Sequence, residues 1–246
     1  MASIEIRCLR ALLVGLVTLA TASVAAAQTF IGPSPYLSQA DSPFAATITA
    51  GTTFLETFES GALTTPGVTP STGSVVAPGG ITDSVDGDDG AIDGFGTAGH
   101  SFFSGNGAAG ITFTFDATVL GHLPTQVGIV WTDGAGTTTF EAFGPGGASL
   151  GTIGPVAIAD GAITGETAED RFFGVTNAAG ISAIKISNTS GGIEVDHLQY
   201  GVFGAAPPPS APLPIPATSD GALLLLALLA ATLGVRGLAK SRRRRA

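Results

Sequence analysis

Carboxylates are the side chains most able to do chemistry in this chain, and they are concentrated in one short segment. Five aspartates fall within eleven residues, interspersed with glycines that permit tight turns: Asp83, Asp86, Asp88, Asp89 and Asp93. Like charges this close are costly unless water or a cation neutralises them. Calcium takes six to eight oxygen ligands and suits such a set, although the spacing is not that of an EF-hand loop. The segment predicts a calcium site, or alternatively a solvated acidic loop.

Two more carboxylates lie near the ends of the region that is rich in expected strands. Glu59 follows the first strand in Phe-Glu-Ser-Gly, and Asp196 lies within the last strand in Ile-Glu-Val-Asp-His-Leu. This arrangement resembles carbohydrate-binding-module-like jelly rolls, in which an acidic residue after the first strand and one in the final strand commonly share a structural calcium ion. The resemblance implies Ca²⁺ at Glu59 and Asp196. The alternative is that both are solvated strand ends or accept hydrogen bonds from backbone amides.

Few aromatic side chains are available to stack against a sugar ring. Trp131 is the only tryptophan, and Phe102 and Phe103 follow the acidic segment. These three are the candidates for a polysaccharide-binding face, since an exposed ring offers a flat apolar platform. The alternative is that all three belong to the core, where the lone tryptophan of a β-sandwich usually lies.

Catalytic motifs are scarce. The three histidines lack the His-Glu-x-x-His spacing of a zinc site, and no Gly-x-Ser-x-Gly nucleophile turn occurs. Glu141 with Glu194 or Asp196 would be a carboxylate pair for glycoside hydrolysis, but any acidic chain offers such pairs. We therefore expect a protein that is not an enzyme, with a secreted polysaccharide hydrolase as the alternative.

Charge is distributed very unevenly along the chain. Residues 28–220 contain 18 Asp and Glu but only Arg171 and Lys185 as cations, a net charge of −16. Such a region repels nucleic acid and anionic lipid, so a nucleic-acid partner is excluded. With so few cations, Arg171 is expected to pair with a carboxylate such as Glu169, Asp170 or Glu194.

Short alternating runs broken by Gly, Pro, Asn and Asp predict an all-β fold, an antiparallel jelly-roll-like β-sandwich of about nine strands in a domain spanning 51–204. The expected strands are 53–58, 101–103, 110–115, 126–132, 137–143, 149–153, 171–175, 181–187 and 193–200. Residues 28–50 read as a loose lead-in, and 66–80 as a loop.

Two local features refine this expectation. Asp133-Gly-Ala-Gly136 predicts a turn, so that the strands on either side of it would form a hairpin. In the last strand the apolar positions change parity between Val195 and Leu198. A β-bulge or a buried Asp196 would resolve that conflict.

Both ends of the chain carry targeting patterns. Residues 1–27 have a basic start, an apolar stretch and a small-residue cleavage site, and predict a secretory signal peptide. Residues 205–220 form a Pro-rich linker, 221–239 an apolar segment long enough for one transmembrane helix, and 240–246 a basic cytoplasmic tail. Arg242, Arg243, Arg244 and Arg245 would hold that end on the cytoplasmic side.

The C-terminal arrangement resembles the sorting signals of the PEP-CTERM type and its Ile-Pro-Thr-Leu and Val-Pro-Leu-Pro-Ala variants. The matching residues are Pro214, Ile215, Pro216, Ala217, Thr218 and Ser219, followed by the apolar helix and the Arg run. The resemblance implies a bacterial protein that is exported and cut near this motif by an exosortase-type membrane enzyme. The alternative is an ordinary single-pass anchor.

Together these features predict an exported protein, tethered to the inner membrane through its C-terminal helix and then placed on the cell surface or in the extracellular matrix. Its folded domain would bind extracellular polysaccharide or serve as a structural coat. The domain resembles the β-sandwich ectodomains found on PEP-CTERM-type proteins, a resemblance that implies no defined activity.

Overall fold

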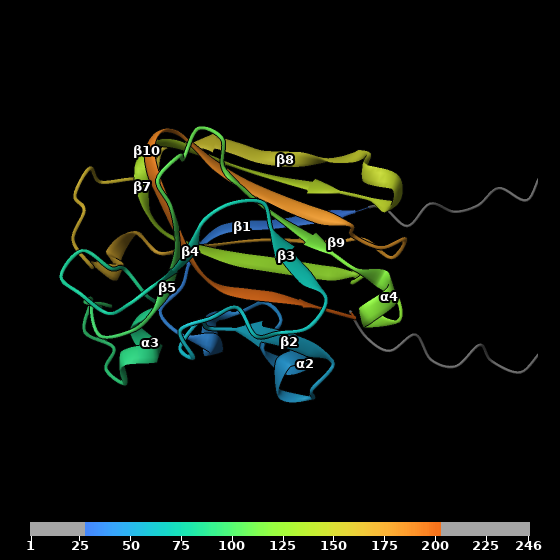
Figure 1. Ribbon diagram of the computed structural model, residues 1–246, viewed down its shortest axis with the longest axis horizontal. Helices are drawn as coiled ribbons and strands as arrows, with labels where there is room; N and C mark the ends of the chain where they lie inside the picture. Colours follow the sequence, from blue (N-terminus) through green and yellow to red (C-terminus); the bar gives the residue numbers. More distant parts are fainter. Residues whose placement is uncertain (1–27, 203–246) are drawn as a thin grey trace, which may run out of the picture. The chain divides into compact units, whose positions relative to one another are not determined.

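The computed structural model describes residues 28–202, and the fold of this part is antiparallel β-sheet with a few short helices (Figure 1). The predicted all-β class is therefore confirmed. The predicted signal peptide, linker, sorting motif and C-terminal helix lie outside the described residues. Within 28–202, no helix is long and apolar enough to cross a membrane.

Ten strands form one hydrogen-bonded network. They are β1 (Thr29–Pro35), β2 (Thr53–Glu56), β3 (Val68–Pro70), β4 (Ser74–Val76), β5 (Ser101–Ser104), β6 (Ile111–Phe115), β7 (Gln126–Phe143), β8 (Ser149–Val156), β9 (Arg171–Thr176) and β10 (Ala183–Gly201). The α-helices are α2 (Ala45–Thr49), α3 (Asp86–Asp89) and α4 (Ala117–Leu120), and the 3₁₀ turns are η1 (Gln39–Asp41), η2 (Pro145–Gly147) and η3 (Thr167–Glu169).

Strands β7 and β10 are the central strand pair of the domain. They pair with each other from Gln126↔Gly201 to Phe143↔Ala183, and they bend together, as Figure 1 shows at the left of the view. The prediction of a turn at 133–136 was wrong, because β7 continues through this segment. Its pairing with β10 shifts register here, and Gly134 lies against the side chain of Asn188, where a Cβ atom would not fit. The glycines permit a bend rather than a reversal.

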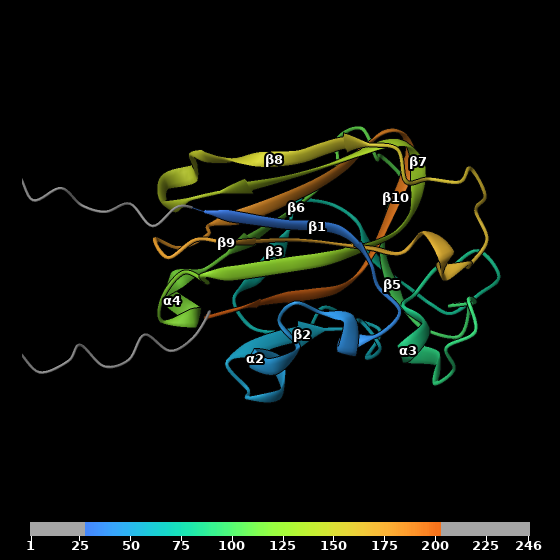
Figure 2. The same cartoon turned by 180° about the vertical axis from the view of Figure 1, so that it is seen from behind.

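The bend divides the pair between two layers (Figures 1 and 2). The first half of β7 pairs with β9, which pairs with β1, while the end of β10 pairs with β2. The second half of β7 pairs with β8, and the start of β10 pairs with β6, which pairs with β3. At the bend, β10 pairs with β5, which pairs with β4.

The main hydrophobic core receives side chains from both layers. It includes Val127, Ile129, Trp131, Phe140, Phe173, Ile184, Ile186, Val195 and Phe102. Trp131 is fully buried and donates its indole N–H to Asn188 Oδ1 at 3.0 Å, and Phe102 is only 2% exposed. The prediction that these two rings form a sugar-binding face was therefore wrong. Strand alternation points both side chains inward, whereas Phe103, the next residue, is 38% exposed.

A smaller core covers the outer face of the layer that contains the first half of β7, β9 and β1, called here the first layer. Val130 of β7 and Phe172 of β9 point into this smaller core, away from the main core. Tyr36 and Phe44 pack on them, with the rings of Phe44 and Phe172 edge to face at 5.6 Å. The prediction of a loose lead-in over 28–50 was therefore wrong. An apolar outer face must be covered, and β1 and the segment after it cover it. The expected loop at 66–80 likewise contains β3 and β4.

The parity change in the last strand is a β-bulge, as expected. The pairing of β10 with β7 shifts register between Asp196 and Gln199, and His197 has a φ of +45°. Because side chains alternate along a strand, the bulge lets both Val195 and Leu198 face the core. Asp196 is also fully buried.

We expect Phe44→Ala to lower the free energy of unfolding by about 3–5 kcal/mol, because it opens a cavity over the outer face of the first layer. Phe95→Ala, at a ring that is 58% exposed, is the matched control and should cost about 0.5 kcal/mol or less. Urea denaturation of both variants measures the difference. Equal, small effects would mean that residues 28–50 do not contribute to the folded domain.

Candidate metal centre

Carboxylates from three distant parts of the chain meet beside the bend of β10. Asp83 and Asp86 come from the acidic segment, Asp170 precedes β9, and Asp196 belongs to β10. Each of these four residues is at most 1% exposed. Backbone amides hold the last of them, since Asp196 accepts hydrogen bonds from Val85 N at 2.9 Å and His197 N at 2.6 Å.

Five carboxylate oxygens of this cluster are buried without a hydrogen-bond partner. They are both oxygens of Asp83, both oxygens of Asp170 and Oδ1 of Asp86. A buried carboxylate normally accepts several hydrogen bonds, because removing it from water without a partner costs several kcal/mol. Buried carboxylate oxygens without a hydrogen-bond partner suit a cation, because a cation accepts their electron pairs.

Glu56 shows how this fold satisfies a buried carboxylate by itself. It is 3% exposed, yet Oε1 accepts from the amide of Phe58 at 3.0 Å. Its Oε2 accepts from the amides of Thr64 and Thr65 at 2.6 and 2.8 Å. The contrast with Asp83 and Asp170 is therefore specific to the cluster and is not a general property of buried acids in this domain.

The electrostatics lead to the same conclusion. Burial raises the pKa of Asp170 well above its usual range, and the nearby charges of Asp83, Asp196 and Asp86 raise it further. Burial also raises the pKa of Asp83 and, together with the charge of Asp88, that of Asp196. Ionising these groups together is unfavourable until a cation joins them.

Neither cation of residues 28–202 serves this purpose. The guanidinium of Arg171 donates to the backbone carbonyls of Ala168 and Asp170, at 3.1 and 2.8 Å. Lys185 lies opposite Glu141, on the other half of the long strand pair. No ion pair joins Arg171 to a carboxylate within the described residues, so the predicted pairing with Glu169, Asp170 or Glu194 was wrong.

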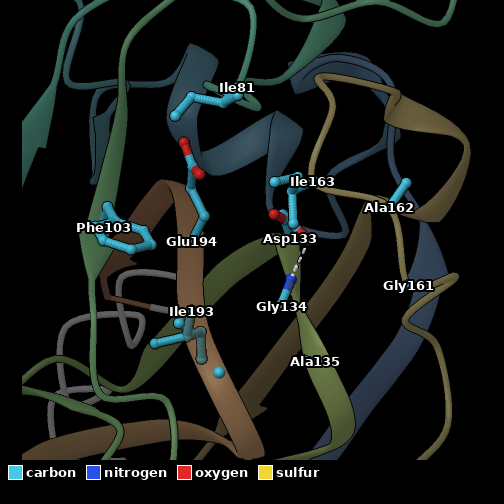
Figure 3. Close-up of a pocket in the computed structure, with 12 residues that line it drawn as sticks. Ile81, Phe103, Asp133, Gly134, Ala135, Gly161, Ala162, Ile163, Ile193 and Glu194 are labelled. Carbon is cyan, nitrogen blue, oxygen red and sulfur yellow. Dashed lines mark hydrogen bonds between the residues drawn. The ribbon is translucent and has the colours of Figure 1, made fainter.

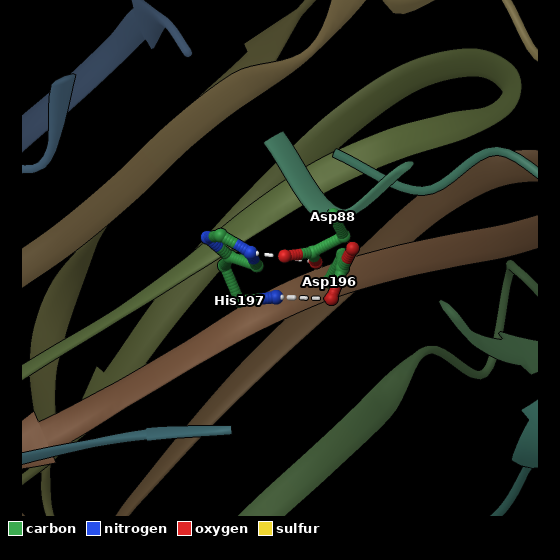
Figure 4. A group of neighbouring side chains, drawn as sticks. All are labelled: Asp88, Asp196 and His197. Carbon is green, nitrogen blue, oxygen red and sulfur yellow. Dashed lines mark hydrogen bonds and ion pairs between the residues drawn. The ribbon is translucent and has the colours of Figure 1, made fainter. Parts of the chain in front are cut away.

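Asp88, Asp196 and His197 also lie together, and one ligand atom from each comes within 4.8 Å of the others (Figure 4). A chain of hydrogen bonds begins at Ser42 and leads through Gln199, Tyr36 and His197 to Asp88. Ser42 donates to Gln199 Oε1 at 2.5 Å, and Gln199 Nε2 donates to the Tyr36 hydroxyl at 3.1 Å.

Both ring nitrogens of His197 are engaged. Nδ1 lies 2.8 Å from the Tyr36 hydroxyl, and Nε2 lies 2.8 Å from Asp88 Oδ2. His197 therefore orients Asp88 beside Asp196.

The donor set that remains consists only of oxygens. Asp83, Asp86 and Asp170 offer the five bare atoms, and Asp196 keeps free lone pairs on a carboxylate held by two amides. Oxygen ligands in this number suit a hard cation, and Ca²⁺ accepts six to eight of them in flexible geometry. Their chemistry suits calcium, but among the described residues only Asp88, Asp196 and His197 bring three ligand atoms within 4.8 Å of one another, so Asp83, Asp86 and Asp170 would have to move inward to share an ion with Asp196.

The structure brings together only part of the predicted calcium ligands. Glu59 accepts from His100 N at 2.5 Å and lies 3.4 Å from the His100 ring, and its charge also raises the pKa of Asp196, but it is not among the residues whose ligand atoms gather with Asp196. Asp89 and Asp93 accept the amides of residues 91 and 95 in local turns, and Asp93 is exposed. Asp83, Asp86, Asp88 and Asp196 do lie near one another.

Asp170 was missed as a member of this acidic cluster by sequence reasoning, and was expected only as a partner of Arg171. A carboxylate directly before the apolar run of β9 was the available signal, because a strand that is buried on both faces also buries the residue at its start. Nothing local indicates that Asp83, 87 positions earlier, lies nearby.

Searches of protein-family models, curated proteins and solved structures find no match to this chain.

We expect saturating calcium to raise the melting temperature of the chelator-treated protein, because an ion that binds only the folded state stabilises it. At one hundred times the Kd the gain is about 2.7 kcal/mol. For a domain of this size that corresponds to roughly 5–10 °C. Thermal melting monitored by circular dichroism, with and without calcium, measures it.

Two variants separate this effect from general stability. Asp170→Asn should abolish the calcium-dependent rise and leave the calcium-free protein as stable as before or more so, since it removes a repelling charge. Glu56→Gln should lower the melting temperature equally with and without calcium, because its carboxylate is held by amides. A calcium response that survives in Asp170→Asn would contradict the assignment.

The calcium-free protein should lose stability as pH rises. Folding raises the pKa of Glu194 and of Glu169 to about 7, in both cases mainly through burial, and that of Asp170 further. The folded state therefore binds more protons than the unfolded chain, so stability falls from about pH 4 to about pH 8. Calcium should reduce this slope, because it displaces the proton on Asp170 but not those on Glu194 and Glu169. Melting temperatures measured across this range in calcium-free and calcium-containing buffers provide the check, and a flat calcium-free profile would count against the buried cluster.

Proposed function

We propose that this chain is an exported, non-enzymatic protein of the cell surface or extracellular matrix, with a calcium-stabilised, jelly-roll-like β-sandwich that binds polysaccharide or forms a structural coat. The observation that carries this proposal is the buried cluster of Asp83, Asp86, Asp170 and Asp196, with bare oxygens and no protein cation. Calcium sites in extracellular modules commonly have Kd values of about 10⁻⁴–10⁻³ M. A site of that kind would fill where calcium is abundant, outside the cell.

In this proposal the two ends of the chain carry the targeting signals. Residues 1–27 direct export, the motif at 214–219 with the apolar segment 221–239 acts as a PEP-CTERM-like sorting signal, and an exosortase-type enzyme processes it. The charge of the region between them supports this placement, since −16 favours solubility and repels nucleic acid. The described chain ends after Gly201 at the end of the domain opposite α3 (Figure 1). A tether there would leave the acidic end free.

The alternative of a polysaccharide hydrolase loses the carboxylate pair on which it was based. Glu141 pairs in register with Lys185, whereas Glu194 pairs with Asp133, eight residues earlier along β7. A straight strand of eight residues would span roughly 25 Å, but β7 bends between these positions, so the register only places Glu141 on the other half of the strand pair from Glu194 and Asp196. This separation favours the non-enzymatic proposal over a hydrolase that uses Glu141 with either residue.

We expect the purified chain to be retained on extracellular polysaccharide in millimolar calcium and released by a chelator, because the ion stabilises the binding domain. Asp170→Asn should be retained equally with and without calcium, or not at all. Glu141→Gln makes the same charge change far from the cluster and should behave as the unmodified chain. Co-sedimentation with the polymer measures retention. Release of soluble sugar, or a calcium response unchanged in Asp170→Asn, would refute the proposal.

A further inference from the structure

A cavity of about 290 Å³ opens where β7 and β10 bend, beside the metal centre (Figure 3). Its walls are apolar: Phe103 of β5 stands on one side, and Ile81 and Ile163 from two loops stand over the opening. Ile81 and Ile163 are 70% and 68% exposed. Apolar side chains this exposed around one hollow are typical of a site that covers them with a ligand.

The polar part of the cavity consists of two carboxylates. Asp133 of β7 and Glu194 of β10 are directly opposite each other in the strand register, so they emerge on the same face of the sheet. No Lys, Arg or His is among the residues that line the cavity. One oxygen of Glu194 is held by Ser101 and by the amide of Asp83, and one of Asp133 by the amide of Gly134.

Burial raises the pKa of Asp133. A ligand that brings positive charge to this cavity would favour the ionised form of that group.

The glycines beside the carboxylates keep the cavity open. A Cβ atom at Gly192 would lie 2.6 Å from the ring of Phe103, so only glycine lets this ring lie against β10. The Phe103 ring therefore lies beside Asp133 and Glu194. One small ligand can contact the apolar ring and both carboxylates.

We propose that this cavity binds an amino sugar, a pyranose residue of an extracellular polysaccharide that carries a free ammonium group. The ammonium would lie between Asp133 and Glu194, while the C–H face of the ring packs on Phe103 and the two isoleucines. This inference rests on the proposed function and names the class of polysaccharide.

Charge and size select this ligand over others. A neutral sugar leaves the buried Glu194 and the half-buried Asp133 without a countercharge, and an anionic sugar is repelled by the net charge of −16 on residues 28–220. A hydrated metal ion finds only two carboxylates among apolar walls. The volume is close to the lower limit of small-molecule pockets, about 300 Å³, so it accommodates one ring rather than a long segment.

The test uses the full chain in mild detergent with calcium present, titrated by calorimetry with a glucosamine trimer and with its fully N-acetylated counterpart. The amine trimer should bind at least about ten-fold more tightly than the acetylated one, because acetylation removes the charge that the carboxylates compensate. Asp133→Asn and Phe103→Ala should each weaken binding of the amine trimer by about ten-fold. Glu141→Gln removes one distant charge and should leave binding unchanged.

Equal binding of the two trimers would overturn the proposal, as would binding of neither. An equal loss in Asp133→Asn and Glu141→Gln would also overturn it, since it would mean diffuse attraction to an acidic surface. Thermal melting of the same samples separates this failure from failure of the proposed function. A chain that responds to calcium but ignores the amine keeps its calcium-stabilised domain and loses only the ligand class.

Discussion

The antiparallel pairing of β7 with β10 is the interaction on which the other parts of the domain depend. Each of these strands contributes one half to each layer, so their common bend creates the space that the main core fills. The bend also determines where polar groups accumulate. Asp133, Glu194 and Asp196 lie at or beside it, where the register shifts and the regular ladder is interrupted.

The bend is surrounded by buried negative charge that the protein itself does not neutralise. Glu56 demonstrates that backbone amides and threonine hydroxyls can satisfy a buried acid in this fold. Asp83 and Asp170 have no such partners, and the hydrogen-bond chain through Tyr36 and His197 leads to Asp88. The calcium ion proposed above would compensate the buried charge of this cluster.

The proposed calcium centre and the cavity are physically connected. Glu194 lines the cavity, and its Oε1 accepts the amide hydrogen of Asp83, which belongs to the cluster. Ordering Asp83 around an ion would therefore also order one of the two carboxylates that face the sugar. Binding of the ion and binding of the ligand would then reinforce each other through shared rigidity.

The sequence by itself determined the features that depend on local periodicity. Alternation over β6 and the apolar run of β9 indicated strands, and the parity change around Asp196 indicated a bulge. The acidic segment was recognisable as a candidate cation site because its charges are adjacent in the chain. Tertiary structure alone decided whether Gly134 lies in a turn or a bend, because the pairing of β7 with β10 overrides the turn preference. It also decided that Asp83, Asp86 and Asp196 gather around Asp170, while Glu59 accepts the amide of His100. Contacts between strands distant in sequence leave no periodic signal, so only the packed sheet reveals which carboxylates meet.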